Sequence, residues 1–111
     1  MARYRLIVFT DAVPGQEAAY DAWYNDVHLA DVADVPGVVS AQRFRLRTPM
    51  AGSFANQNLA IYEIDGDDPD QVIAAIEARG ATGQMVISDS LDQSNMSVGV
   101  FEACSERVMA H

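Results

Sequence analysis

The chain has 111 residues and a mass of 12.1 kDa, which predicts one domain and excludes two independent catalytic domains. Sixteen acidic and seven basic residues give a net charge of −9, so nucleic acid and anionic membranes are not expected partners. Every basic residue is arginine, which excludes chemistry that needs a lysine, such as Schiff-base formation.

The compartment is predicted from cysteine use and from the lack of long apolar runs. Cys104 is the single cysteine, so an internal disulfide or a cysteine-based zinc site is excluded. No apolar run approaches the roughly 20 residues that cross a bilayer, and residues 1–10 do not resemble a signal peptide. We expect a cytoplasmic protein with no membrane partner.

The first half of the chain predicts a strand, a helix and a second strand. Residues 3–10 are apolar on both alternating faces, as in a central strand. Residues 16–31 have the three- and four-residue apolar spacing of an amphipathic helix. Its expected stripe consists of Ala19, Tyr20, Trp23, Val27 and Ala30. After a stop at Pro36 and Gly37, residues 38–47 alternate again and predict a second strand.

The second half predicts a strand, a capped helix and a last strand. Residues 48–57 form a loop, and residues 58–64 the third strand. Asp68 and Pro69 are typical of a helix start, and we expect this helix to end at Gly80. Residues 81–94 fit either a short helix or a packed loop, and residues 96–103 alternate as a fourth strand. We therefore expect one domain over residues 1–104 and a C-terminal tail over residues 105–111.

This order of elements predicts an α+β fold of the ferredoxin-like βαββαβ type. Such a protomer has a four-stranded antiparallel sheet with both helices on one face. Because apolar residues occur on both faces of the predicted strands, the face without helices would expose a large apolar surface. We expect a second copy to cover it, so the predicted assembly is a homodimer whose two sheets pack face to face.

Three short segments of the first half resemble the EthD-like branch of the dimeric α+β barrel superfamily. They are Trp23-Tyr24-Asn25-Asp26-Val27-His28-Leu29 and Val35-Pro36-Gly37-Val38 with Ser40-Ala41-Gln42-Arg43-Phe44. The resemblance implies a ferredoxin-like protomer, a sheet that pairs with its twin and a small apolar pocket between sheet and helices. Such families include cofactor-free monooxygenases, isomerases, cyclases and haem-degrading enzymes, so fold alone does not select a reaction. The family often has a proline two residues after the histidine, and in this chain that position is occupied by Ala30.

His28 is the candidate catalytic residue, because it is the one histidine outside the predicted tail. We place it near the end of the first helix, where the helix dipole and Asp31 would favour the imidazolium and bring its titration near neutral pH. There it could act as a general acid or base. The alternative is a structural role, in which His28 caps a free carbonyl at the helix end or binds Asp31.

The candidate substrate-binding residues are Tyr24, Asp31, Arg43 and Tyr62. Tyr24 is expected beside His28, where its ring can pack in the core and its hydroxyl can reach a pocket. Tyr62 either lines a flat aromatic pocket or fills the core. Arg43, Arg45 and Arg47 share one strand face, and Arg43 could bind a substrate carboxylate. For Arg45 and Arg47 we favour pairing with Glu63 or Glu102.

No metal motif or phosphate loop is present, and a single histidine is weak evidence for haem, so we expect no cofactor. The resulting hypothesis is a small cofactor-independent enzyme of the isomerase, lyase or cyclase type. His28 would move a proton on an apolar, aromatic or lactone-bearing metabolite. A cofactor-free monooxygenase is one alternative, and a non-catalytic dimeric binding or stress-response protein is the other.

Overall fold

The computed structural model describes residues 3–111, and the first two residues of the predicted domain lie outside it. The chain folds as β1 (Tyr4–Thr10), a long helical run, β2 (Val38–Arg45), β3 (Asn58–Ile64), α3 (Pro69–Ala81) and β4 (Ser97–Glu102). The helical run has three parts, namely α1 (Glu17–Trp23), the π-helical turn η1 (Tyr24–His28) and α2 (Leu29–Ala33). The predicted order of elements is therefore confirmed.

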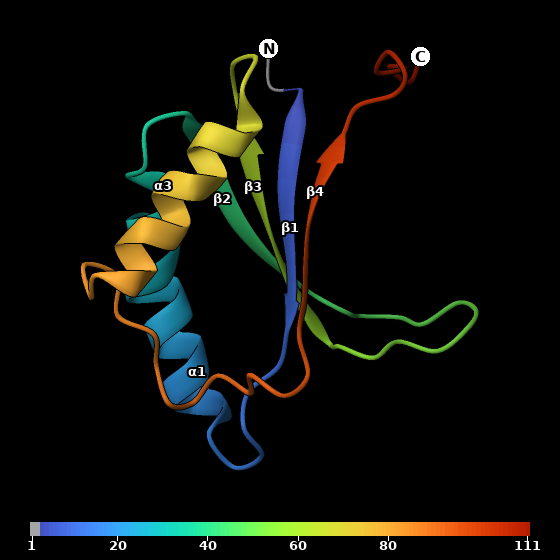
Figure 1. Ribbon diagram of the computed structural model, residues 1–111. Helices are drawn as coiled ribbons and strands as arrows, with labels where there is room; N and C mark the ends of the chain where they lie inside the picture. Colours follow the sequence, from blue (N-terminus) through green and yellow to red (C-terminus); the bar gives the residue numbers. More distant parts are fainter. Residues whose placement is uncertain (1–2) are drawn as a thin grey trace.

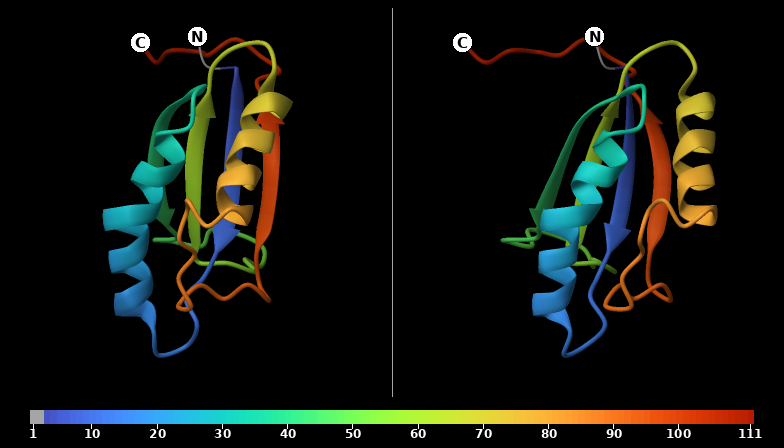
Figure 2. Two further views of the ribbon diagram at one scale, coloured as in Figure 1. Left: turned by 60° about the vertical axis from the view of Figure 1, so that its left-hand side comes forward. Right: turned by 90° about the vertical axis from the view of Figure 1, so that its left-hand side faces the viewer.

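The four strands form one antiparallel sheet in the order β2-β3-β1-β4, so β2 and β4 are the edges. Both helical segments lie on the same face of this sheet (Figures 1 and 2). The ferredoxin-like α+β architecture predicted from the sequence is thus confirmed. The loop of residues 46–57 leaves the sheet on the side away from the helices (Figure 1).

The strand register separates the residues of the two faces. Ala41, Tyr62, Leu6 and Val100 form one row across the sheet beneath the helices. The neighbouring row consists of Gln42, Ile61, Ile7 and Gly99 and faces the other way. Leu6 and Tyr62 are buried, whereas Ile7 and Ile61 stay partly exposed. The prediction that both faces are apolar is confirmed, and Tyr62 is assigned to the helix side.

The second helix begins as its sequence predicts. The Asp68 carboxylate accepts a hydrogen bond from the Gln71 amide at 3.2 Å, and Pro69 occupies the first helical position. Gly37 has a φ of 98°, and a Cβ there would come within 2.5 Å of Val72 on α3. Glycine at this turn thus lets β2 start directly beneath the second helix.

The first helix differs most from its prediction. It continues to Ala33, and Val27 of the expected apolar stripe is 40% exposed. Ala19 and Ala30 are exposed as well, while Tyr24 and Val32 are buried. The reason is the π turn, in which the Leu29 amide donates to the Tyr24 carbonyl five residues earlier and shifts the buried face.

Three boundaries are also corrected. β2 ends at Arg45 rather than at residue 47, and β4 spans Ser97–Glu102 rather than residues 96–103. We predicted either a short helix or a packed loop for residues 81–94. Ala81 is the last residue of α3, and residues 82–96 form a loop with one isolated bridge between Leu91 and Ala12.

Candidate functional site

The candidate site is a cluster of aromatic and polar side chains between the helical run and the sheet. Tyr24 lies at its centre and is 2% exposed. The His28 ring meets it edge-on, with the centroids 5.2 Å apart. The Arg43 guanidinium carbon lies over the Tyr24 ring at 4.8 Å, and Tyr62 approaches from β3. The structure thus brings four of the five predicted site residues together.

The π turn explains how His28 and Trp23 come to lie on the same side of the helix. At 3.6 residues per turn, side chains five positions apart diverge by about 140°. A π turn closes over five residues instead. The His28 and Trp23 rings consequently stack, with centroids 4.5 Å apart and an interplanar angle of 22°. π turns often coincide with functional sites, which favours a functional role for this segment.

His28 does not cap a helix end, because the helical run continues five residues beyond it to Ala33. Its side chain is partly exposed, but its Nδ1 atom is buried without a hydrogen-bond partner. Burial lowers the pKa of His28 from 6.5, and the nearby Asp31 carboxylate opposes this shift. The expectation that the imidazolium is favoured is therefore wrong. The physical reason is desolvation, which penalises the charged ring more than Asp31 stabilises it.

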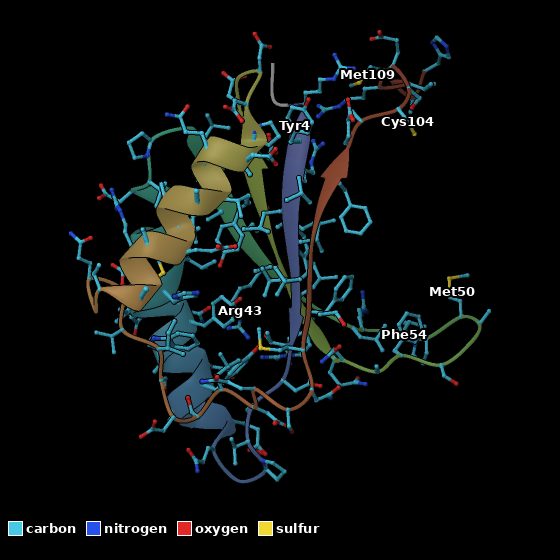
Figure 3. The ribbon with its side chains drawn as sticks, viewed as in Figure 1. Tyr4, Arg43, Met50, Phe54, Cys104 and Met109 are labelled. Atoms are coloured by element: carbon cyan, nitrogen blue, oxygen red, sulfur yellow. The ribbon has the colours of Figure 1, made fainter. Side chains whose placement is uncertain are left out.

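Arg43 is held by the helix that faces it. Its guanidinium donates to Asn25 at 2.8 Å and to Asp21 at 3.0 Å, and its side chain is 11% exposed. Figure 3 shows the Arg43 side chain in the space between the sheet and the helical run. Its guanidinium carbon also lies 5.1 Å from the centroid of the Tyr20 ring. Its Nε atom is buried and has no partner. Arg43 therefore has one N–H group directed into the interior that its protein ligands do not use.

The predicted pairing of the other strand arginines is wrong for Arg45. Arg45 pairs with Asp21 at 3.4 Å, while Glu63 pairs with Arg5 and Glu102 with Arg3. Arg43 and Arg45 both point to α1, so an acidic residue on that helix is nearer to them than Glu63, which lies on the opposite face of the sheet. No ion pair of Arg47 is found among the described residues.

Tyr62 contributes a phenol hydroxyl that is buried and makes no hydrogen bond of proper geometry. Desolvation raises its pKa far above 10, and the Tyr24 hydroxyl near it acts in the same direction. Burial raises the pKa of Tyr24 and Tyr20 too, and the Tyr20 hydroxyl lies 2.7 Å from that of Thr10. Tyr62 thus stays a neutral phenol with an O–H group to donate.

Three buried polar atoms around Tyr24 therefore lack partners, namely His28 Nδ1, Arg43 Nε and the Tyr62 hydroxyl. Leaving a buried polar group unpaired costs about 1 to 3 kcal/mol each, so native proteins rarely keep three together without a reason. Two of the atoms are hydrogen-bond donors, and a neutral imidazole nitrogen can accept a proton. The cluster thus supplies two hydrogen-bond donors and one possible proton acceptor, each next to Tyr24.

The cluster is flanked by two open hollows. One, of about 510 Å³, is lined by Tyr20, Asp21 and Asn58 among others. The other, of about 360 Å³, is lined by Asp31, Arg79 and Met85 among others. Neither is lined by Tyr24, His28 or Tyr62, so the cluster is closed off from both. Asp31 thus lies apart from the other predicted site residues and acts on His28 only through its charge.

Three residues at the site were not predicted as functional. Asp21 and Asn25 hold Arg43, and Trp23, which we assigned to the core, stacks on His28. Asp21 and Asn25 are four residues apart and so share a helix face, which was the available signal.

None of the described helices has the length and apolar character of a membrane span. Within residues 3–111, no group of three or more His, Cys, Asp or Glu side chains is placed to hold a metal ion.

Comparison with known proteins identifies the fold. No family model and no curated protein matches the sequence. Among solved structures, the heme-degrader MhuD from Mycobacterium tuberculosis, which has two hemes in its active site, is similar at 16% identity and a TM-score of 0.63. The match covers 95% of this chain and 99% of MhuD.

Two further structures have the same architecture. An EthD family protein from Bacillus halodurans is similar at 17% identity and a TM-score of 0.56, over 91% of this chain and 98% of that one. SnoaB, a cofactor-independent oxygenase from Streptomyces nogalater, is similar at 16% identity and a TM-score of 0.55, over 96% and 97% of the two chains. The resemblance to EthD-like proteins is thus confirmed at the level of the fold.

Proposed function

We propose that this protein is a small cofactor-independent enzyme that removes a proton from an apolar, enolisable metabolite. The observation that carries the proposal is the group of three unpartnered atoms around Tyr24, His28 Nδ1, Arg43 Nε and the Tyr62 hydroxyl. One acceptor and two donors are what the removal of a proton next to a carbonyl group requires. The Trp23 and Tyr24 rings favour a planar, aromatic substrate.

In this reaction His28 is the general base. With its proton on Nε2, the neutral ring presents the Nδ1 lone pair to an acidic C–H group of the substrate. The proton moves to Nδ1, and the electron pair of the C–H bond moves onto the carbonyl oxygen to give an enolate. The low pKa of His28 keeps the ring neutral and able to accept this proton at pH 7.

Tyr62 and Arg43 would stabilise the enolate oxygen. The Tyr62 O–H and the Arg43 Nε–H are already desolvated, so a hydrogen bond to a developing negative charge gains more here than in water. Asp21 and Asn25 fix the guanidinium and leave Nε free, and Tyr24 separates Arg43 from His28. Asp31 would stabilise the protonated His28 after the transfer.

The enolate can go on in two ways. Return of the proton from His28 to another carbon completes an isomerisation, and no other reactant is needed. Alternatively, molecular oxygen oxidises the enolate, so that a CH₂ group becomes a carbonyl group, with one oxygen atom in the product and the other released as water. The second route is the reaction of a cofactor-free monooxygenase, and SnoaB, among the similar structures, is a cofactor-independent oxygenase.

The competing proposal is a binding protein without chemistry. It is favoured by the closure of the cluster, because Tyr24 is 2% exposed and neither flanking hollow reaches His28. A catalytic cluster must therefore open to admit its substrate. The two proposals differ in one respect that can be measured, which is whether His28 exchanges a proton with a bound molecule.

The sheet face without helices supports a homodimer. Ile7, Ile61 and Phe9 are only partly buried there, and Phe44 and Phe101 are 42% and 53% exposed. An apolar surface of this extent is typical of an interface. A second copy is the partner that we propose, because its own face is equally apolar and the two would bury each other. We further propose that the dimer acts in the cytoplasm.

Deuterium exchange tests the proton transfer without knowledge of the natural substrate. We would incubate enolisable aromatic ketones and lactones, beginning with 2-tetralone, in D₂O and follow the loss of the α-proton by NMR. The protein should accelerate the exchange, and His28→Gln should reduce it by about two to four decades. Exchange that survives His28→Gln, or no exchange above the buffer rate with any compound, would overturn the proposal. Loss of the α-proton without oxygen uptake would favour the isomerase over the oxygenase.

A further inference from the structure

The inference concerns Trp23, the only tryptophan of the chain, which links His28 to a distant loop. One face of its indole stacks on the His28 imidazole at 4.5 Å. Its Nε1–H donates a hydrogen bond of 2.9 Å to the carbonyl oxygen of Val86, in the loop of residues 82–96. Trp23 is 8% exposed, so the indole is held on both sides.

The loop is secured at its two ends more firmly than at Val86. At the start, the Met85 amide donates to the Arg79 carbonyl at 3.1 Å, and the Met85 side chain is 4% exposed. Further along, the Ser90 carbonyl accepts from the Val13 amide at 2.7 Å. Between these two points the structure gives one hydrogen bond from the loop to another element, the bond to Trp23.

The same stretch carries apolar side chains that its position does not bury. Val86 is 62% exposed and Ile87 is 42% exposed. Apolar packing therefore contributes little to holding residues 86–87 against the helix. The hydrogen bond from Trp23 thus supplies a larger fraction of the free energy that keeps this part of the loop in place than a single hydrogen bond usually does.

We propose that Trp23 is a positioning residue that couples His28 to the loop of residues 82–96. While the loop is closed, its carbonyl fixes the indole, and the indole fixes the plane of the imidazole against Tyr24. When the loop lifts at Val86, the indole loses its anchor, and the His28 ring becomes free to turn its buried Nδ1 atom towards water. Because the cluster is closed in this structure, the same movement is the route that we infer for substrate entry.

The proposal rests in part on the proposed function, but its physical content can be tested without a substrate. The groups near the imidazole are the Trp23 and Tyr24 rings and the Asp31 carboxylate. Removing the indole exposes the imidazole to water while Tyr24 and Asp31 remain. Burial is the main cause of the low pKa of His28, so that pKa should rise.

The experiment compares two substitutions at Trp23 with one at Tyr20. Trp23→Phe keeps an aromatic ring for stacking but cannot donate to Val86, and Trp23→Leu removes the stack as well. Tyr20→Phe is the matched control, because Tyr20 is a buried aromatic on the same helix that has no ring contact with His28. The readouts are the NMR pH titration of the His28 ring, assigned with His28→Gln, and hydrogen exchange of amides 84–89.

In Trp23→Phe, amides 84–89 should exchange about two- to tenfold faster, as expected for the loss of one hydrogen bond. In Trp23→Leu, the pKa of His28 should also move up towards 6.5. Tyr20→Phe should change neither quantity. Wild-type exchange and an unchanged His28 titration in both Trp23 variants would overturn the proposal, even if Trp23→Leu is less stable. A shift of the titration in a protein without proton-transfer activity would support the coupling and reject the proposed function.

Discussion

The two faces of the sheet use the same strands for different purposes. On the helix side, the protein covers its own residues and still leaves three polar atoms without partners around Tyr24. On the other side, the apolar residues have no such cover, and Phe101 is 53% exposed. Adjacent residues such as Ile61 and Tyr62 thus belong to different environments. This difference is why we place the proposed chemistry on the shielded face and the proposed association on the open one.

The largest expected effect is a difference in the free energy of unfolding between substitutions on the two faces of the sheet. Tyr24→Ala removes a ring that is 2% exposed and should lower the free energy of unfolding by about 3 to 5 kcal/mol. Phe101→Ala truncates a ring that is half in water, and the protomer should lose about 1 kcal/mol or less. Urea unfolding at two protein concentrations measures both, because only the dimer contribution depends on concentration. Equal losses would contradict the assignment of the faces.

The second prediction places a charge on the open face. Ile61→Glu should dissociate the proposed dimer, because a carboxylate in an apolar interface loses its hydration, and Kd should rise at least about 100-fold. Sedimentation at micromolar concentration measures this. The control is Ala74→Glu, which adds the same charge at an exposed position of α3, on the other face of the sheet, and should leave the dimer intact. A wild-type protein that is monomeric at this concentration would reject the homodimer.

The third prediction concerns the hydroxyl of Tyr62. Tyr62→Phe removes a buried hydroxyl that interacts with Tyr24 but makes no hydrogen bond of proper geometry, so the protein should lose no stability and gain up to about 1 kcal/mol. The same substitution removes a donor to the enolate, and proton exchange should slow by about 10- to 100-fold. Opposite effects on stability and activity are typical of functional groups. A loss of stability would show that the hydroxyl has a structural partner.

The smallest effect is the pH dependence of stability that His28 contributes. Since burial lowers its pKa in the folded state, the unfolded chain binds a proton more readily. The wild-type protein should therefore lose stability relative to His28→Gln as the pH falls below 6.5, and the difference should be constant above that value. Urea unfolding of both proteins across this range is the measurement. A difference that grows towards alkaline pH would mean that the pKa is raised.

Much of the fold could be predicted because its signals are local. The alternation of residues 3–10 and 58–64 and the cap at Asp68 each specify an element within a few residues. The assignment of Tyr62 and Phe101 to faces could not be made, because period-two alternation separates two faces without saying which one the helices cover. That information resides in the register between strands far apart in the sequence.

The sequence predicted that four of the five candidate side chains lie near one another, but it did not predict their electrostatics. Tyr24, His28, Arg43 and Tyr62 were named from residue type and position, and the structure brings them together. The state of His28 was predicted wrongly, because a helix of regular pitch ending near residue 31 would place it at a charged terminus. A π turn has no simple sequence pattern, and it alone moves His28 to the interior and onto Trp23.

The most direct test of the account is the ¹⁵N NMR spectrum of the His28 ring at pH 7. The central claim is that a neutral imidazole keeps the Nδ1 lone pair free inside the cluster. The account predicts a ring whose single proton is on Nε2, with Nδ1 unprotonated and not hydrogen bonded. A doubly protonated ring, or a proton on Nδ1, would contradict it, because His28 could not then accept a proton from a molecule bound beside Tyr24.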